Sequence, residues 1–234
     1  MVLTGAGIST ESGLPDFRSP GSGLWRDSSA MELLSATTLW SRPQLFYTRA
    51  LDLLEELTRA EPNPAHRVLA AWEKQGRVAT LVTQNIDNLH YRAGSRRVLE
   101  VHGQLRTASC SKCGHSSTFA ELVRRARRGD IPPLCSDCRG WVRPDVVLFE
   151  DPMPEAFVAA VEEVQRSELL LVVGSSLQVA PVAYLPRLCR RLAIVNLSPT
   201  GCDSLAEVVV SGRAGQVLGQ LAALLDGGDE PCTT

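Results

Sequence analysis

GAGISTESGLPDFRS, residues 5–19, follows directly on the apolar pair Val2 and Leu3. A strand followed by a glycine turn begins the units that bind dinucleotides, whose usual pattern G-x-G-x-x-G turns tightly around the phosphates. The place of the third glycine is taken here by Thr10, and the next glycine is Gly13. The stretch therefore predicts a nucleotide-binding strand and turn that continue into a longer arm.

Short apolar runs recur along the chain, with helix-like stretches between them. The runs are residues 2–4, 78–83, 169–173, 193–197 and 208–210, and the helix-like stretches are 65–75, 156–168 and 216–225. Continuous runs of leucine and β-branched residues are typical of strands buried on both faces of a parallel sheet. The alternation predicts an α/β fold, a doubly wound parallel sheet with its ligand loops at the carboxyl ends of the strands.

Two segments interrupt this alternation. Residues 20–60 contain no strand candidate and are predicted to be helical, and residues 108–140 hold two cysteine pairs. We expect both to form a smaller lobe. The predicted division is a discontinuous nucleotide-binding domain (1–19, 61–107 and 141–225), a helical module (20–60), a zinc-binding module (108–140) and a disordered tail (226–234).

Composition excludes several classes of protein. The 234 residues carry 24 Lys and Arg against 26 Asp and Glu, a net charge of −2, so no overall positive field indicates a nucleic-acid partner. No apolar run approaches the roughly 20 residues of a membrane span, and no signal peptide is evident. The sequence therefore predicts a cytoplasmic protein that contacts neither membrane nor specific nucleic acid.

Four cysteines are spaced as two C-x2-C pairs, Cys110 with Cys113 and Cys135 with Cys138, with 21 residues between the pairs. Two such knuckles can surround one zinc ion with four thiolates, and a closed sulfur shell indicates a structural site. His115 is a competing ligand, but four cysteines already suffice, so a polar residue of the knuckle is the favoured interpretation. A redox C-x-x-C site needs only one cysteine pair, at the start of a helix, so the two pairs here do not indicate redox chemistry.

Polar side chains follow the predicted strand at residues 78–83. Gln84, Asn85 and Asp87 lie where a strand tip meets a ligand cleft, although a turn with self-capping Asn and Asp is an equally good explanation of this cluster alone. His102 follows a further apolar run beside a glycine. Histidine is the side chain best suited to proton transfer near neutral pH, although a lone histidine is more often structural.

Two later strand ends also carry small or polar residues. Gly174, Ser175 and Ser176 offer backbone amides and hydroxyls to a phosphate at a helix start. Asn196 and Ser198 follow the next run, where an amide side chain can hold the ribose hydroxyls in place of the usual acidic residue.

In chain order, GAGIST with GLPDFRS, TQNIDNLH, VHG, the C-x2-C knuckles, RPDVVLF and GSSLQVAP resemble the motifs of the sirtuins, the NAD-dependent protein-lysine deacylases. The resemblance covers nearly all of residues 1–225. It implies a Rossmann-like large domain, a small lobe made of the zinc and helical modules, and a cleft in which NAD meets an acylated lysine of a protein. The implied products are free lysine, nicotinamide and O-acyl-ADP-ribose.

The resemblance also implies residue roles. His102 acts as general base, while Asn85 and Asp87 orient the nicotinamide end. The implied NAD-binding residues are Gly5, Ala6, Gly7, Ser9, Thr10, Asp16, Phe17, Arg18, Gln84, Asn85, Ile86, Asp87, His102, Gly174, Ser175, Ser176, Asn196, Leu197, Ser198 and Ala214. The implied substrate-binding residues are Phe17, Tyr47, Ile86, Val147 and Phe149. Strand alternation sends Val147 and Phe149 to one face, where they can line an acyl-lysine tunnel while the backbone edge pairs with the peptide.

Two departures from the sirtuin pattern bear on substrate choice. Glu150 stands where the family has glycine, and an added carboxylate there should favour basic residues beside the acyl-lysine. Sirtuins that remove acidic acyl groups typically carry Tyr-x-x-Arg, whereas Tyr47 is followed three residues later by Ala50. We therefore expect a deacetylase. We also expect the protein to be a monomer. The alternatives are a desuccinylase or other deacylase, a mono-ADP-ribosyltransferase using the same NAD site, and a non-catalytic NAD sensor.

Overall fold

The computed structural model describes residues 1–16 and 28–227, and its main feature is a six-stranded sheet. The strands are β1 (Val2–Thr4), β2 (Leu81–Thr83), β3 (Val98–Glu100), β7 (Leu170–Val173), β8 (Leu192–Asn196) and β9 (Val208–Ser211), in the spatial order β3-β2-β1-β7-β8-β9. Every neighbouring pair is parallel, as the apolar runs predict. The doubly wound α/β fold is confirmed.

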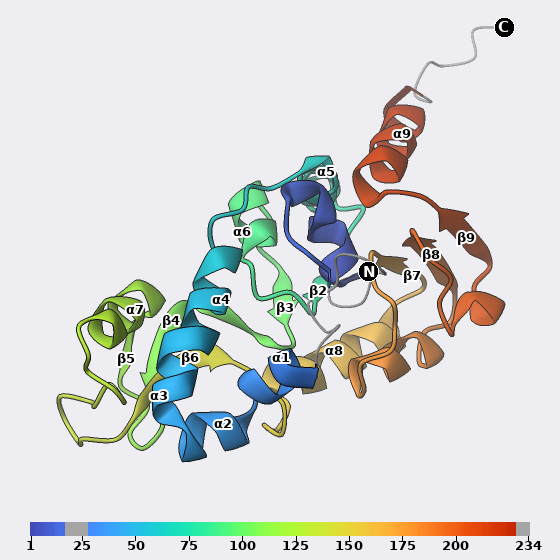
Figure 1. Cartoon of the computed structure of the whole chain (residues 1–234). Helices are drawn as coiled ribbons and strands as arrows, with labels where there is room; N and C mark the ends of the chain where they lie inside the picture. The colour runs from blue at the N-terminus through green and yellow to red at the C-terminus, as the bar shows by residue number, and fades with distance from the viewer. Residues whose placement is uncertain (17–27, 228–234) are drawn as a thin grey trace, which may run out of the picture.

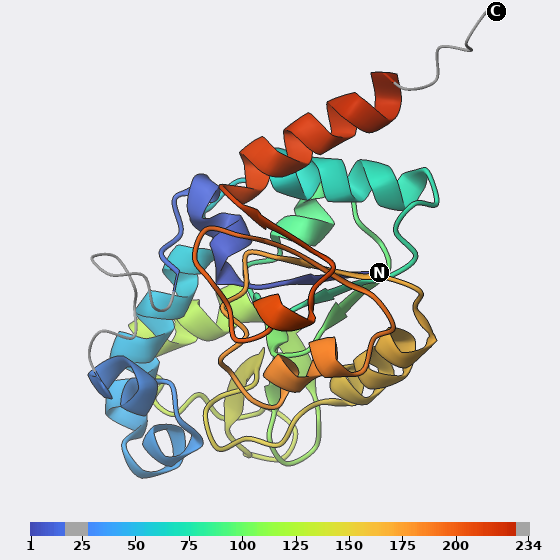
Figure 2. The same ribbon diagram turned by 90° about the vertical axis from the view of Figure 1, so that its right-hand side faces the viewer.

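Helices cover both faces of this sheet, as Figure 2 shows with the sheet seen between them. One face carries α5 (Pro64–Lys74), α6 (Leu89–Ala93) and α9 (Ala214–Gly227), and the other carries α8 (Glu155–Arg166) and the 3-10 helix η4 (Val182–Arg187). Leu69 of α5 and Leu218 of α9 are fully buried in one apolar cluster, and Val164 of α8 is fully buried in the other. Each such side chain contributes about 1.5–3 kcal/mol by burial.

A smaller unit lies at the other end of the molecule (Figure 1). Its antiparallel sheet has the order β5-β4-β6, from β4 (Gly103–Cys110), β5 (Ser116–Thr118) and β6 (Val142–Val146). The helices beside it are α1 (Ser28–Leu33), α2 (Ala36–Ser41), α3 (Pro43–Leu45), the π-helical turn η3 (Phe46–Ala50), α4 (Leu51–Leu57) and α7 (Phe119–Arg127). One buried cluster, with Phe46 and Leu122 near its centre, joins helices and sheet.

The small sheet departs from the boundaries predicted at residues 107 and 141. Its strands begin at Gly103 and continue through Val146, because β4 pairs with β6 across the whole cysteine segment. At Gly103, φ is +79° and a Cβ atom would lie 2.2 Å from the Asp145 carbonyl oxygen, so this close strand pairing requires glycine. The predicted boundaries place residues 103–107 of β4 and all of β6 in the large domain, because a local apolar pattern does not identify the strand with which a segment pairs.

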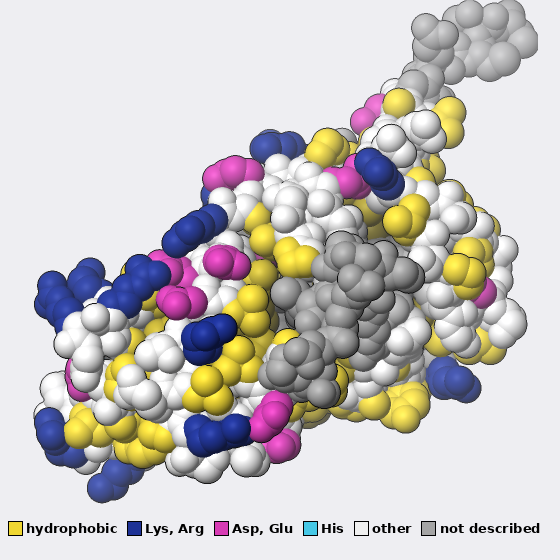
Figure 3. All heavy atoms as spheres, in the orientation of Figure 1, with side chains coloured by type: hydrophobic (Ala, Val, Ile, Leu, Met, Phe, Trp, Pro, Cys, Tyr) yellow, Lys and Arg dark blue, Asp and Glu magenta, His cyan; other side chains and the backbone are white. Residues whose placement is uncertain are grey.

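Arginine side chains gather over α7 at one end of the molecule (Figure 3). Arg127 pairs with Glu55 of α4, and Arg125 pairs with Asp130 at 2.6 Å between Nη2 and Oδ2. Exposed ion pairs of this kind each contribute little to stability. The Arg127 pair joins α7 to α4, the Arg125 pair joins α7 to the loop that follows it, and both guanidinium groups have partners.

The carboxyl-terminal helix is longer than predicted. α9 runs to Gly227, two residues beyond the expected end at Leu225, and the rest of the predicted disordered tail, residues 228–234, lies outside the described residues. None of the helices within residues 1–16 and 28–227 combines the length and apolarity that a membrane span requires.

Candidate active site

The site lies where the strand order of the large sheet reverses, between β1 and β7. Successive strands from β1 run toward one edge and those from β7 toward the other, so the loops after these two strands separate and leave a crevice. The loop after β1 is the 3-10 helix η1 (Ala6–Ser12), which begins after Gly5. Residues 5–12 therefore lie at the topological switch point of the sheet.

Three glycines allow these two loops to touch. The Gly7 amide donates to the Gly174 carbonyl oxygen at 2.8 Å, and a Cβ at Gly7 would lie 2.8 Å from that same oxygen. A Cβ at Gly174, where φ is +62°, would lie 2.2 Å from the Ile8 nitrogen. A Cβ at Gly5 would meet the Ser175 side chain at 2.9 Å. Side chains at these positions would push the loops apart, so the glycines shape a close-fitting backbone cradle.

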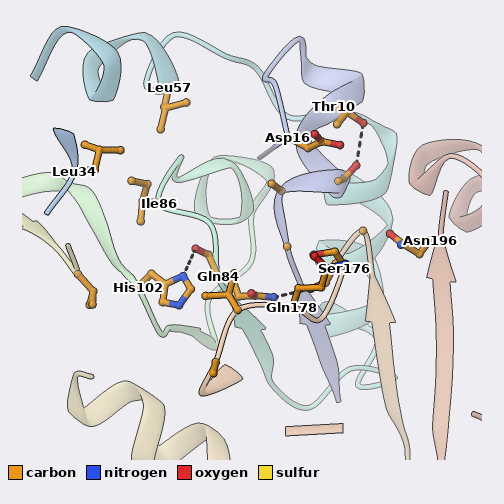
Figure 4. A pocket seen from close by; sticks show the side chains of 18 of the residues that line it. Thr10, Asp16, Leu34, Leu57, Gln84, Ile86, His102, Ser176, Gln178 and Asn196 are labelled. Atoms are coloured by element: carbon orange, nitrogen blue, oxygen red, sulfur yellow. Dashed lines mark hydrogen bonds between the residues drawn. The ribbon is translucent and has the colours of Figure 1, made fainter. Parts of the chain in front are cut away.

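A cavity of about 620 Å³ opens between the large sheet and the small unit. It brings together most of the predicted site: Gly5, Ala6, Gly7, Thr10, Asp16, Gln84, Ile86, His102, Val147, Phe149, Gly174, Ser175, Ser176, Asn196, Leu197, Ser198 and Ala214. Figure 4 shows Leu34, Leu57 and Ile86 grouped near His102 at one end, and polar side chains toward the other. The predicted residues Phe17 and Arg18 lie outside the described part of the chain.

Among the leucines that line the cavity, Leu34 in the α1–α2 connection and Leu57 at the end of α4 are absent from the predicted site. Apolar residues in a segment predicted to be helical are ordinarily interpreted as core, and only the placement of this segment against the cleft brings them to the cavity.

His102 is held in one tautomer by the neighbouring strand end. Its Nδ1 lies 3.0 Å from the Gln84 carbonyl oxygen, which can only accept, so Nδ1 carries the proton and Nε2 is left with a free lone pair. Burial lowers the pKa of His102, against a smaller opposing effect of the Gln84 hydrogen bond. The imidazole is thus neutral near pH 7 and can accept a proton at Nε2.

Ser9, Asn85 and Asp87 lie behind the cavity wall instead of lining it. Asn85 and Asp87 are 7% and 5% exposed. The Asn85 Nδ2 donates to the Gly5 carbonyl oxygen at 3.2 Å and to Ser9 Oγ at 3.1 Å, and Ser9 Oγ donates to Asp87 Oδ2 at 2.7 Å. These side chains therefore support the first loop from below.

Burial raises the pKa of the Asp87 carboxyl group, while its hydrogen bonds from the Leu89 amide and the Ser9 hydroxyl act in the opposite direction. The Asn85 Oδ1 is buried with no hydrogen-bond partner among the described residues. The fit to a nucleotide rests on the cradle at Gly5, Gly7 and Gly174, whose missing side chains let a ligand approach the backbone closely, and on polar residues such as Gln84 and Asn196 that line the cavity. The residues present fit NAD.

The loop after β7 differs from the prediction. No helix begins directly after Gly174, since residues 175–181 are irregular and η4 begins only at Val182. The predicted helix start at these residues is wrong, whereas phosphate binding by Gly174, Ser175 and Ser176, which line the cavity, stays a prediction. Gln84 Nε2 instead donates to Ser175 Oγ at 2.8 Å, which fixes this loop to the end of β2. Asn196 Nδ2 donates to the Ser198 carbonyl oxygen within its own loop.

Tyr47 does not line the cavity, which corrects its predicted contact with substrate. The side chain is 2% exposed within the core of the small unit, and its hydroxyl donates to the Val142 carbonyl oxygen at 2.8 Å. Burial raises the pKa of the phenol. The π-helical turn at Phe46–Ala50 orients Tyr47 inward, while Arg49 on the same turn is exposed.

Val147 and Phe149 are half-buried and Val146 and Leu148 are buried, as the predicted alternation requires, although all four residues contribute to the cavity lining. β6 nevertheless ends at Val146. The backbone of Phe149 pairs with the α1–α2 connection, donating to the Leu34 carbonyl oxygen at 3.0 Å and accepting from the Ala36 amide at 2.9 Å. At Phe149 the predicted free edge is thus already occupied by the chain itself.

Glu150 occupies a backbone conformation that glycine adopts most easily, with φ at +76°. Its Oε2 accepts from the Thr37 amide at 2.9 Å and from the Thr37 hydroxyl at 2.7 Å, and these bonds lower the pKa of the carboxyl group. Asp151 instead pairs with Arg143. The added carboxylate of Glu150 therefore has an uncharged hydrogen-bond partner, whereas the neighbouring Asp151 has a charged one.

The four predicted cysteine ligands come together in the small unit. Their sulfur atoms lie within 4.8 Å of one another, with 3.4 Å between Cys110 and Cys138 and 3.7 Å between Cys113 and Cys135. Thiolates bound at about 2.3 Å to one tetrahedral zinc ion lie about 3.8 Å apart. The donor set fits structural zinc. His115 pairs with Asp137 at 2.8 Å and is not part of this cluster.

The comparisons with known proteins agree with this geometry. A family model described as the Sir2 family matches residues 5–181. The NAD-dependent protein deacetylase 2 of Caldanaerobacter subterraneus subsp. tengcongensis is 51% identical over 218 residues, 93% of this chain and 87% of the relative. The NAD-dependent protein deacetylase of Bacillus subtilis is 41% identical over 92% of this chain and 91% of its own.

Solved structures give the same result. A structure described as Sir2-p53 peptide-NAD+ is similar with a TM-score of 0.86 at 36% identity, and the similarity covers 97% of this chain and 92% of the other. A structure of Sir2Tm bound to a propionylated peptide is similar with a TM-score of 0.84 at 35% identity, over the same shares of both chains.

Proposed function

Because the chain belongs to the Sir2 family, we propose that it is an NAD-dependent protein-lysine deacetylase. It transfers the acetyl group of an acetyl-lysine to ADP-ribose and releases nicotinamide and free lysine. The observation that carries this proposal is His102, whose Nδ1 is bound to Gln84 and whose Nε2 is free beside the cavity. A base in this position serves acyl transfer, whereas a non-catalytic NAD sensor has no use for one.

NAD supplies an activated ribose carbon once its bond to nicotinamide breaks. The cradle of Gly5, Gly7 and Gly174 would hold the nucleotide close to the backbone, and the loop at Asn196 would lie beside its ribose. Asn85 and Asp87 would orient the nicotinamide end from below the first loop. His102 would accept a proton from a ribose hydroxyl at Nε2. The four cysteines would hold zinc as a structural ion.

The apolar end of the cavity favours acetyl over succinyl groups. Leu34, Leu57 and Ile86 surround the space near His102, and the arginine among the described residues that line the cavity is Arg213, beside the start of α9. A succinyl carboxylate would be buried there without a cation, which is costly. Propionyl or similar short neutral groups fit the same apolar surroundings.

Products of NAD incubated with acetyl- and succinyl-lysine peptides, identified by mass spectrometry, test the proposal. We expect acetyl-lysine turnover with formation of O-acetyl-ADP-ribose, and a loss of about 10²–10⁴-fold in His102→Ala. His115→Ala, an exposed histidine of the zinc module, is the matched control and should keep full activity. Full turnover by His102→Ala would remove its role as base, and nicotinamide release without acylated peptide would favour ADP-ribosyl transfer.

We also propose that residues 1–16, 61–102 and 147–225 form the NAD-binding domain, and that the small unit, residues 28–57 and 103–146, is the second lobe. Three apolar clusters support this division: two lie within the NAD-binding domain, and the third is built almost entirely from the small unit, with Leu148 and Ile86 added from the large domain. The monomeric state, the cytoplasmic location and the absence of a nucleic-acid partner stay predictions from the sequence. Light scattering, cell fractionation and a binding assay with DNA and RNA test them.

A further inference from the structure

An acidic side chain of the first loop contacts the carboxyl-terminal helix. Glu11 lies in η1 and is half-buried, and its Oε2 accepts a hydrogen bond from the Gly215 amide of α9 at 2.6 Å. The two residues are 204 positions apart in the sequence. The proposed chemistry gives this contact no role.

The contact caps a helix that has no acidic cap of its own. The first four backbone N–H groups of a helix lack partners within the helix, and a negative charge beside them is stabilising. The first turn of α9 contains no acidic residue, and the side chain of the preceding Arg213 can only donate. The carboxylate of Glu11 therefore supplies the acceptor from another element.

Glycine at position 215 leaves the space that the carboxylate occupies. A Cβ atom at Gly215 would lie 2.9 Å from Glu11 Oε2 and 3.0 Å from Oε1, which is closer than such atoms approach. Neither Glu11 nor Gly215 is among the described residues that line the cavity. A side chain at position 215 would therefore displace the carboxylate without entering the cavity.

The same contact joins two walls of the cavity. η1 lines the cavity at Thr10, among other residues, and residues 212–214 line it where the chain enters α9. The Gly212 amide donates to the Asn196 carbonyl oxygen, at the end of β8, at 3.1 Å. Figure 4 shows Thr10 and Asn196 at the end of the cavity away from His102. The start of α9 is thus held at the polar end of the cavity by β8 on one side and by η1 on the other.

We propose that Glu11 is a positioning residue for the adenosine end of NAD, acting by capping α9 and holding its start against η1. This inference rests on the proposed function for the identity of the ligand. The reacting ribose carbon has to lie within reach of His102, so the adenosine at the far end of the dinucleotide extends toward Asn196 and the start of α9. Without the cap, the helix start adopts its binding geometry for a smaller fraction of the time, and the affinity falls by that fraction.

Calorimetric titration with ADP-ribose, which carries the adenosine and needs no turnover, tests the inference. We expect Glu11→Ala to weaken ADP-ribose binding about five- to ten-fold, the usual effect of losing one helix cap. Glu11→Gln keeps an acceptor oxygen and should recover most of the affinity. In steady-state kinetics, Glu11→Ala should raise the KM for NAD and leave the KM for an acetyl-lysine peptide unchanged.

Gly215→Ala separates positioning from the stability of the helix. Alanine favours a helix more than glycine does, yet its Cβ displaces the Glu11 carboxylate, so this variant should also lose affinity for ADP-ribose. Such a loss could not come from a poorer helix former. Adding Glu11→Ala to Gly215→Ala should weaken binding no further, because both changes remove the same contact.

Asp226→Asn is the matched control, since Asp226 pairs with Arg77 at 3.0 Å at the other end of α9. It should leave the affinity for ADP-ribose unchanged. Unchanged affinity in Glu11→Ala or in Gly215→Ala, additive losses in the double variant, or an equal loss in Asp226→Asn would overturn the inference. A wild-type chain that binds ADP-ribose without deacetylating peptides would refute the proposed reaction and still test Glu11, and one that binds no ADP-ribose would overturn both.

Discussion

The substitution Tyr47→Phe, which removes only the hydroxyl oxygen, tests whether Tyr47 is a core residue or a substrate contact. The sirtuin resemblance assigns Tyr47 to the substrate, whereas the structure buries its hydroxyl against the Val142 carbonyl oxygen at 2.8 Å. Removing this oxygen leaves packing nearly unchanged and deletes one buried hydrogen bond. The expected loss is about 1–1.5 kcal/mol of the free energy of unfolding. For a chain of this length that lowers the unfolding temperature by about 2–6 °C.

The assay pairs thermal unfolding with steady-state kinetics on an acetyl-lysine peptide. We expect the lower unfolding temperature with an unchanged KM for the peptide. Tyr91→Phe is the matched control, because the Tyr91 hydroxyl is only partly buried and its contact with the Val98 carbonyl oxygen is long, at 3.4 Å. Its unfolding temperature should fall less than that of Tyr47→Phe. An unchanged unfolding temperature together with a raised KM would refute the reasoning and return Tyr47 to the cleft.

The dependence of the free energy of unfolding on pH above 10 is an independent test of the burial of Tyr47. Burial raises the pKa of the folded-state phenol above the unfolded value of 10, so the folded state keeps its proton where the unfolded chain loses it. The stability difference between wild type and Tyr47→Phe should therefore be constant below pH 10 and shrink as the pH rises above it.

Two further predictions concern metal and acid. Cys135→Ser removes one of four thiolates and should abolish binding of the single zinc ion, measured by elemental mass spectrometry, and lower the unfolding temperature. Cys202→Ser, a change at a cysteine buried outside the cluster, should keep the zinc. Full zinc content in Cys135→Ser would contradict the site. Burial lowers the pKa of His66 to about 4 and that of His90 well below its usual value, so the unfolded chain binds more protons below pH 6.5. As the pH is lowered from 6.5 to 5, the free energy of unfolding measured with denaturant should fall by about 1 kcal/mol per pH unit for each histidine, and by less in His66→Gln. A free energy of unfolding that does not change over this range in the wild type would exclude neutral buried histidines.

Local sequence determined the large sheet and the chemistry of its loops. Apolar runs predict five of its six strands, and β3 at Val98–Glu100 corresponds to the run noted before His102. The C-x2-C spacing predicts the metal cluster, and the glycines of the first loop predict a close backbone approach. Such features can be predicted from the sequence because they depend on periodicity or on the spacing of ligands within a few residues.

Tertiary structure decided which residues face the cleft. Ser9 and Asp87 carry the right chemistry in the sequence, but the folded chain buries them beneath the cavity wall. Leu34, in the α1–α2 connection, and Leu57, at the end of α4, line the cavity although their sequence pattern is typical of core. The Ser9–Asp87 hydrogen bond spans 78 residues and that between Tyr47 and Val142 spans 95. Contacts of this range follow from how whole elements pack, so no local pattern specifies them, and the burial of Tyr47 and the hydrogen bond between Ser9 and Asp87 exist only in the folded chain.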